Sequence, residues 1–96
     1  MTQARLVILI YDVASNKRRT KLHALLKQYG VPVQESAFEA RLTPSERTQL
    51  LGRIEELLVS KEDRFVMYVV PPAHEEAIAV VGQARPEVKA RTYFIV

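Results

Sequence analysis

The sequence of 96 residues contains no cysteine and only two histidines. The lack of cysteine excludes disulfides, zinc–thiolate sites and thiol nucleophiles. His23 and His74 are far apart in dissimilar contexts, which argues against a histidine-rich metal centre or a Ser-His-Asp triad within one chain. No apolar run is long enough to cross a bilayer, and the start "MTQARL" lacks the regions of a secretory signal. We therefore expect a cytoplasmic protein with no membrane partner.

Acidic residues are also absent from one long stretch, between Val13 and Gln34. Five basic residues occur there: Lys17, Arg18, Arg19, Lys21 and Lys27. The net charge of the chain is only +3, so this block holds a concentrated share of the positive charge. Such a block is typical of polyanion binding, whereas a merely solvated helix face usually mixes the two signs.

Hydrophobic patterns in the first half predict a strand and a helix. The apolar run Leu6–Tyr11 favours a strand covered on both faces. Ser15 or Asn16 is suited to cap a following helix, and leucines at helical spacing give that helix one apolar stripe. Gly30 is expected to end the helix as a left-handed cap.

The rest of the chain predicts a second helix and several strands. "VQESAFEARL" at Val33–Leu42 alternates as one half-exposed strand or as a tight hairpin. "TPSE" at Thr43–Glu46 is a capping box that begins a helix. Further strands are expected at Arg64–Val70, Ala77–Gly82 and Thr92–Val96.

This order predicts a single α+β domain over residues 1–96. If Val33–Leu42 supplies two strands, the arrangement is the βαββαβ sandwich of ferredoxin-like domains, with an extra C-terminal strand. Both helices would cover one face of the sheet and leave the other uncovered. An uncovered face and an apolar tail together predict a homodimer. The candidate dimer contacts are Tyr93, Phe94, Ile95 and Val96.

Asp12 is the candidate catalytic and metal-binding residue. It directly follows the buried strand, and the other aspartate, Asp63, lies in the polar turn "SKEDR". Mg²⁺ is usually held by one or two carboxylates together with waters and substrate phosphate. One Asp12 carboxylate per chain is few for a Mg²⁺ site, but two Asp12 carboxylates across a dimer axis would be enough. The alternative is an aspartate that only caps or turns the chain before the helix.

Candidate nucleic-acid contacts lie close to Asp12 in the sequence. Arg18, Arg19 and Lys21 begin the basic helix, and arginine binds phosphate in a bidentate way. Surface exposure without a ligand is the alternative for these residues. Tyr11 and Phe38 are aromatic strand residues that could stack on bases, although core packing is the commoner role of such residues.

Three motifs in combination resemble a known family. "YDV…NKRRTKLHALLKQYG", "VQESAFEARLTPSE" and "RFVMYVVP" are similar in order and spacing to the second CRISPR-associated protein family, the small partner of the CRISPR integrase. The resemblance covers Leu6 to about Pro71 and implies a ferredoxin-like homodimer. The family's metal aspartate falls on Asp12, and its strand aromatic falls on Phe38. Its basic helix positions fall on Arg18, Arg19 and Lys21.

The resemblance implies a role in antiviral defence. The expected activity is a Mg²⁺-dependent endonuclease, with Mn²⁺ as a possible substitute, that hydrolyses single-stranded RNA or duplex DNA. The expected partner is the CRISPR integrase subunit, during spacer integration. One alternative is a non-catalytic scaffold that clamps DNA for that integrase. Another is a toxin-like ribonuclease of similar fold.

Overall fold

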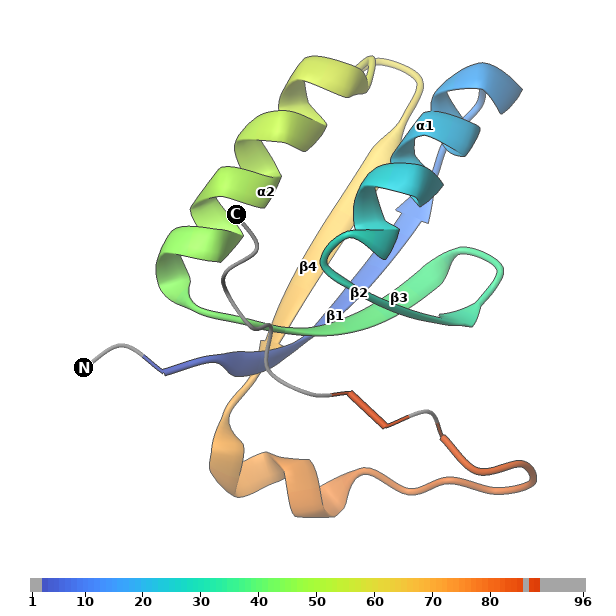
Figure 1. The fold of residues 1–96 in the computed structure, drawn as a ribbon. Helices are drawn as coiled ribbons and strands as arrows, with labels where there is room; N and C mark the ends of the chain where they lie inside the picture. The colour runs from blue at the N-terminus through green and yellow to red at the C-terminus, as the bar shows by residue number, and fades with distance from the viewer. Residues whose placement is uncertain (1–2, 86, 89–96) are drawn as a thin grey trace.

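The protein is described by a computed structural model, which covers residues 3–85 and 87–88. Strands and helices follow one another in the order βαββαβ (Figure 1). Their bounds are β1 Arg5–Asp12, α1 Asn16–Lys27, β2 Gly30–Gln34, β3 Ala37–Leu42, α2 Pro44–Leu57 and β4 Arg64–Val70, followed by a short 3₁₀ helix, η1, at Pro72–Ala77. Among these residues no helix is long and apolar enough to span a membrane.

The strands form one antiparallel sheet in the order β2-β3-β1-β4. Both helices lie on the same side of this sheet (Figure 1). This is the ferredoxin-like arrangement expected from the sequence, and Val33–Leu42 contributes to a hairpin rather than to one strand. β1 is a central strand, so the residue that follows its apolar run lies in the middle of one sheet edge.

The core lies between the sheet and the two helices. Alternation along β1 sends Val7, Leu9 and Tyr11 into this core. Leucines of α1 and α2 cover them from the helix side. The complete cluster consists of Val7, Leu9, Tyr11, Val13, Leu22, Leu26, Tyr29, Phe38, Ala40, Leu42, Leu50 and Ile54.

Both helices begin at the caps that the sequence predicts. The Ser15 side chain accepts a hydrogen bond from the Arg18 backbone N–H at 3.2 Å. Thr43 and Glu46 form the reciprocal capping box, with distances of 2.8 and 3.2 Å. These local bonds fix where α1 starts, and therefore how far its basic residues lie from the end of β1.

Gly30 has a different role from the one predicted. It is the first residue of β2, and no residue with positive φ other than Gly82 occurs in the part of the chain that the structure describes. A Cβ at Gly30 would lie 2.2 Å from the backbone oxygen of Glu39 and 2.7 Å from the Cβ of Ala40. Glycine is therefore required for the close approach of β2 to β3, not for a left-handed helix cap.

The predicted strand at Ala77–Gly82 is wrong. Ala77 ends η1, and residues 78–82 have no strand structure. The side chain of Val81 is 99% exposed, so the apolar sequence "AIAVVG" does not pair with the sheet. The predicted strand at Thr92–Val96 lies outside the described residues.

The segment after β4 lies on the face of the sheet opposite the helices, at the bottom of Figure 1. Two side chains of β3 hold it there. Arg41 pairs with Glu75 at 2.8 Å and also donates to the backbone oxygen of Val88, while Glu39 accepts from Arg85 at 3.0 Å. Ionic contacts, rather than strand pairing, therefore hold this segment against the sheet.

The remainder of that face is open near β1 and β4. Ile8 and Ile10 of β1 face this side, opposite Tyr68 and Val66 of β4. Ile10 is 41% exposed and Tyr68 is 56% exposed. We call this exposed area, together with Asp12, the open face.

Candidate active site

Asp12 is the last residue of β1, and its side chain is exposed. In the β1–β4 ladder its partner is Arg64. Residues paired directly across antiparallel strands project from the same face of the sheet, so both belong to the open face. The alternation that buries Tyr11 exposes Asp12, which gives the carboxylate access to solvent and to a ligand.

An open polar hollow of about 420 Å³ lies beside Asp12. The turn between α2 and β4 and the first residue of β4 supply the rest of its lining. The complete set is Asp12, Ser60, Lys61, Glu62, Asp63 and Arg64. The hollow therefore combines carboxylates with two basic side chains.

Asp63 is the most constrained of these carboxylates. Its side chain is fully buried. One oxygen accepts from the backbone N–H of Ala14 at 3.0 Å, and the other accepts from that of Val59 at 2.9 Å. Arg18 contacts both oxygens, at 2.7 and 3.1 Å. Asp63 thus joins the β1–α1 loop, the end of α2 and the first turn of α1.

The charge of Arg18 shapes this cluster. Its hydrogen bond holds the pKa of Asp63 well below its ordinary value, and the bonds from the Val59 and Ala14 amides act in the same direction. The hydrogen bond to Asp63 in turn raises the pKa of Arg18. Arg18 also pairs with Glu62 at 3.0 Å. Asp63 is therefore an ionised structural carboxylate at any physiological pH.

The other predicted basic residues differ in their surroundings. Arg19 donates to the backbone oxygen of Val13 and to Oδ1 of Asn16. Lys21 is exposed on α1. Arg18 and Arg19 thus both have hydrogen-bond partners within the chain near the β1–α1 junction. Phosphate binding by Arg18, Arg19 and Lys21 stays a prediction.

The structure corrects the role predicted for Phe38. Its side chain is 0% exposed, because β3 places it on the same face as Ala40 and Leu42, under the helices. The ring contacts His23 edge-on, with the ring centres 5.2 Å apart, and lies 6.5 Å from the ring of Tyr11. A ring in this position packs the core and cannot stack on a base.

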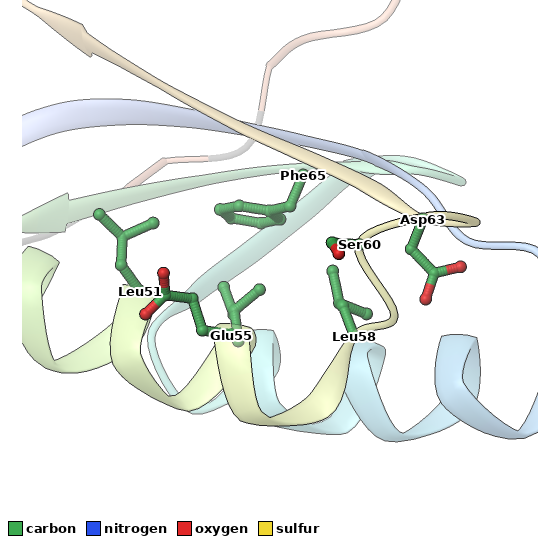
Figure 2. A pocket seen from close by; sticks show the side chains of 7 residues that line it. Leu51, Glu55, Leu58, Ser60, Asp63 and Phe65 are labelled. Atoms are coloured by element: carbon green, nitrogen blue, oxygen red, sulfur yellow. The ribbon is translucent and has the colours of Figure 1, made fainter.

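A second hollow, of about 430 Å³, lies between α2 and β4. Figure 2 shows Leu51, Leu58 and Phe65 around it, with Asp63 pointing towards α1. Its other acidic lining residue is Glu55, on the exposed side of α2. This hollow is largely apolar and brings no reactive group to a ligand, so we place the candidate site at Asp12.

The donor set at Asp12 is compatible with Mg²⁺. Within the described residues no three His, Cys, Asp or Glu side chains form a group that could hold a metal ion. Asp63 and Glu62 are paired with Arg18, so Asp12 is the carboxylate of the hollow that has no ion pair among the described residues. A single hard oxygen ligand per chain fits a cation that keeps several waters and shares substrate phosphate. A second carboxylate would have to come from another copy of the chain.

Sequence reasoning missed Asp63, Lys61 and Arg64. The turn "SKEDR" reads as an ordinary polar connection, and only the antiparallel pairing of β1 with β4 brings it to Asp12. The predicted dimer residues Tyr93, Phe94, Ile95 and Val96 lie outside the described residues.

The sequence model of the family described as "CRISPR associated protein Cas2" matches residues 5–77. The chain belongs to the Cas2 family. A Thermus thermophilus protein named "CRISPR-associated endoribonuclease Cas2" is 39% identical over 66 residues, which are 69% of this chain and 70% of that protein.

Solved Cas2 structures have the same fold. Streptococcus pyogenes Cas2 has a TM-score of 0.71 and 27% identity, covering 80% of this chain and 99% of that one. A chain of a partial Cas6-RT-Cas1–Cas2 complex has a TM-score of 0.66 and 28% identity, covering 80% and 90%. The family match spans the whole βαββαβ unit, and so it includes both Asp12 and the turn beside it.

Proposed function

We propose that this Cas2 chain is a metal-dependent endonuclease of CRISPR adaptation that acts as a homodimer. The observation that carries the proposal is the position of Asp12. It is an accessible carboxylate at the end of a central strand, next to an open polar hollow. The endoribonuclease name of the Thermus relative supports hydrolysis of a phosphodiester in RNA, for which we propose a single strand, and duplex DNA is the alternative substrate.

The homodimer completes the site. Ile10 and Tyr68 leave an apolar area on the open face, and burying it against a second copy would stabilise the pair by about 25 cal/mol for each Å² removed from water. Asp12 lies on the same face, so a two-fold axis that passes close to it would bring two Asp12 carboxylates together. The predicted tail contacts at residues 93–96 would add to this interface.

Each residue then has a defined task. The Asp12 carboxylates of the two chains would hold the cation, with their position fixed by the end of β1. A Mg²⁺ ion held there would supply polarisation of the scissile phosphate and activation of water. Asp63, through the Ala14 amide and Arg18, holds the loop that follows Asp12 against the start of β4. Exposed bases of α1 such as Lys21 attract the polyanionic substrate.

A scaffold role is the second candidate. It is favoured by the structural similarity to a Cas2 chain in a complex that contains Cas1. In this role the basic surface would clamp DNA for the integrase, with no hydrolysis by this chain. Membership of the Cas2 family favours either of these roles over a toxin-like ribonuclease.

The nuclease proposal predicts a cation requirement. Purified protein should cleave end-labelled single-stranded RNA in Mg²⁺ or Mn²⁺ and lose that activity in excess EDTA. The reason is that a carboxylate such as Asp12 is not a Lewis acid and cannot by itself polarise the phosphate. Adding excess Mg²⁺ back should restore cleavage. Cleavage that is indifferent to the chelator would overturn the metal-dependent mechanism. Absence of cleavage of RNA and of duplex DNA, with DNA binding retained, would leave the scaffold role.

A further inference from the structure

We infer that Lys61 and Arg64 form a phosphate-binding subsite beside Asp12, and that this subsite holds the RNA backbone next to the cleaved bond. The inference rests on the proposed nuclease function, and it concerns residues that α1 does not supply. Both side chains line the hollow that contains Asp12. The subsite would therefore engage the same strand that the Asp12 carboxylate acts on.

The charges of the hollow divide into engaged and available groups. Asp63 accepts hydrogen bonds from two backbone amides and from Arg18, and Glu62 pairs with the same arginine. By contrast, no hydrogen bond or ion pair of the Lys61 or Arg64 side chain occurs within residues 3–85 and 87–88. The positive charges of the hollow that have no partner among the described residues are thus Lys61, in the turn before β4, and Arg64, at the start of β4.

Arg64 has the more specific position of the two. It is the ladder partner of Asp12, and both residues are exposed, yet they form no ion pair within 4.0 Å. A guanidinium in that position is free to donate two parallel hydrogen bonds to a phosphate while Asp12 holds a cation. Lys61, on the turn before the strand, adds a mobile point charge to the same hollow.

Arg18 is less suited to this task. Its side chain is 22% exposed, and three of its hydrogen bonds go to Asp63 and Glu62. Binding phosphate through Arg18 would require breaking these bonds and would leave a fully buried Asp63 carboxylate without its counter-charge. Binding through Lys61 and Arg64 requires no such rearrangement, and it leaves Arg18 as the residue that positions the loop after Asp12.

The test compares two double variants that remove the same charge. Lys61→Ala with Arg64→Ala removes the subsite. Arg5→Ala with Arg47→Ala removes two positive charges that both lie beside Leu42, at the end of β1 opposite Asp12. Binding of single-stranded RNA is measured by fluorescence anisotropy over a series of salt concentrations, with each pair placed in an Asp12→Asn background so that RNA is not consumed.

We expect the subsite variant to flatten the slope of log affinity against log salt by about 1.4 units per protomer, or about 0.7 for each single-strand phosphate that is no longer neutralised. The control pair should leave the slope unchanged. Arg64→Lys should retain most of the slope, since it keeps the charge. Thermal unfolding followed by circular dichroism should be unaffected, because both residues are exposed and make no ion pair within the described residues.

An unchanged slope in the subsite variant, together with a lower Mg²⁺ requirement of the Arg64→Ala enzyme, would overturn the inference. Arg64 would then be only a counter-charge to Asp12. If wild type cleaves RNA and the salt slope of the subsite variant does not change, the subsite inference is wrong and the nuclease proposal stands. If no variant or wild type cleaves but the slope falls as expected, the subsite stands and the nuclease proposal fails.

Discussion

Replacing Asp12 by asparagine is expected to lower the rate of RNA cleavage in Mg²⁺ by at least about a hundredfold, or about 2.7 kcal/mol of transition-state stabilisation. Asparagine keeps the size and one acceptor of the side chain but removes the charge that binds the cation. The fold should survive, because Asp12 is exposed at the end of β1 and contributes nothing to the core. Single-turnover cleavage and thermal unfolding of the same preparation measure both quantities.

Glu56→Gln is the matched control for this change. It removes one carboxylate of the same charge from an exposed position on α2, and it should leave both the rate and the melting temperature unchanged. If Asp12→Asn cleaves as fast as wild type, the measured nuclease comes from a contaminant. The scaffold role would then be the remaining function of the chain.

Replacing Asp63 by alanine is expected to lower the melting temperature by several degrees. The change leaves the amides of Ala14 and Val59 without their acceptor and frees Arg18 from its buried counter-charge. Glu62→Gln is the control, because Glu62 is the other partner of Arg18. The Glu62 side chain is 59% exposed, so its ion pair with Arg18 contributes little to stability. An equal loss in both variants would contradict the structural role of Asp63.

The stability lost in Asp63→Ala relative to wild type should depend on pH in a defined direction. The folded-state pKa of Asp63 is lowered, so its stabilising contribution is present above its ordinary pKa of 3.8 and is lost as the pH falls below it. The difference in melting temperature between wild type and Asp63→Ala should therefore be constant from neutral pH down to about pH 4 and should shrink in more acidic buffer. A difference that grows on acidification would have the wrong sign for this carboxylate.

Local signals in the sequence were enough to predict most of the fold. Ser15 and the Thr43–Glu46 box cap the two helices because capping depends on residues within one turn. The apolar run before Asp12 forms strand β1, as predicted, but it is not covered on both faces, since Ile10 on the face away from the helices is 41% exposed. These features need no knowledge of distant parts of the chain.

The errors come from interactions that are distant in sequence. Residues 78–82 have strand-forming side chains, but the Arg41–Glu75 and Arg85–Glu39 contacts place the segment across the sheet instead of within it. Phe38 could be read as a stacking residue or as a core residue, and only its register with Leu9 on β1 decides for the core.

The candidate site likewise contains one residue that local sequence signals predict and partners that they do not predict. Asp12 was predictable from its place at the end of an apolar run. The partners of that site were not, because Arg64 meets Asp12 only through the β1–β4 ladder and Asp63 meets Arg18 from 45 residues away. A polar turn gives no local signal that one of its acids will be buried and another of its residues will face a carboxylate.

The most direct test of the shared Asp12 site is cleavage by mixed dimers. Wild-type chains and Asp12→Asn chains, co-refolded at varied ratios, form homodimers and heterodimers at random. If one cation is held between two Asp12 carboxylates, activity should fall with the square of the wild-type fraction, so that equal mixing leaves about a quarter of it. Activity that falls in simple proportion to the wild-type fraction would show that each chain carries a complete site, and it would contradict the shared-site account.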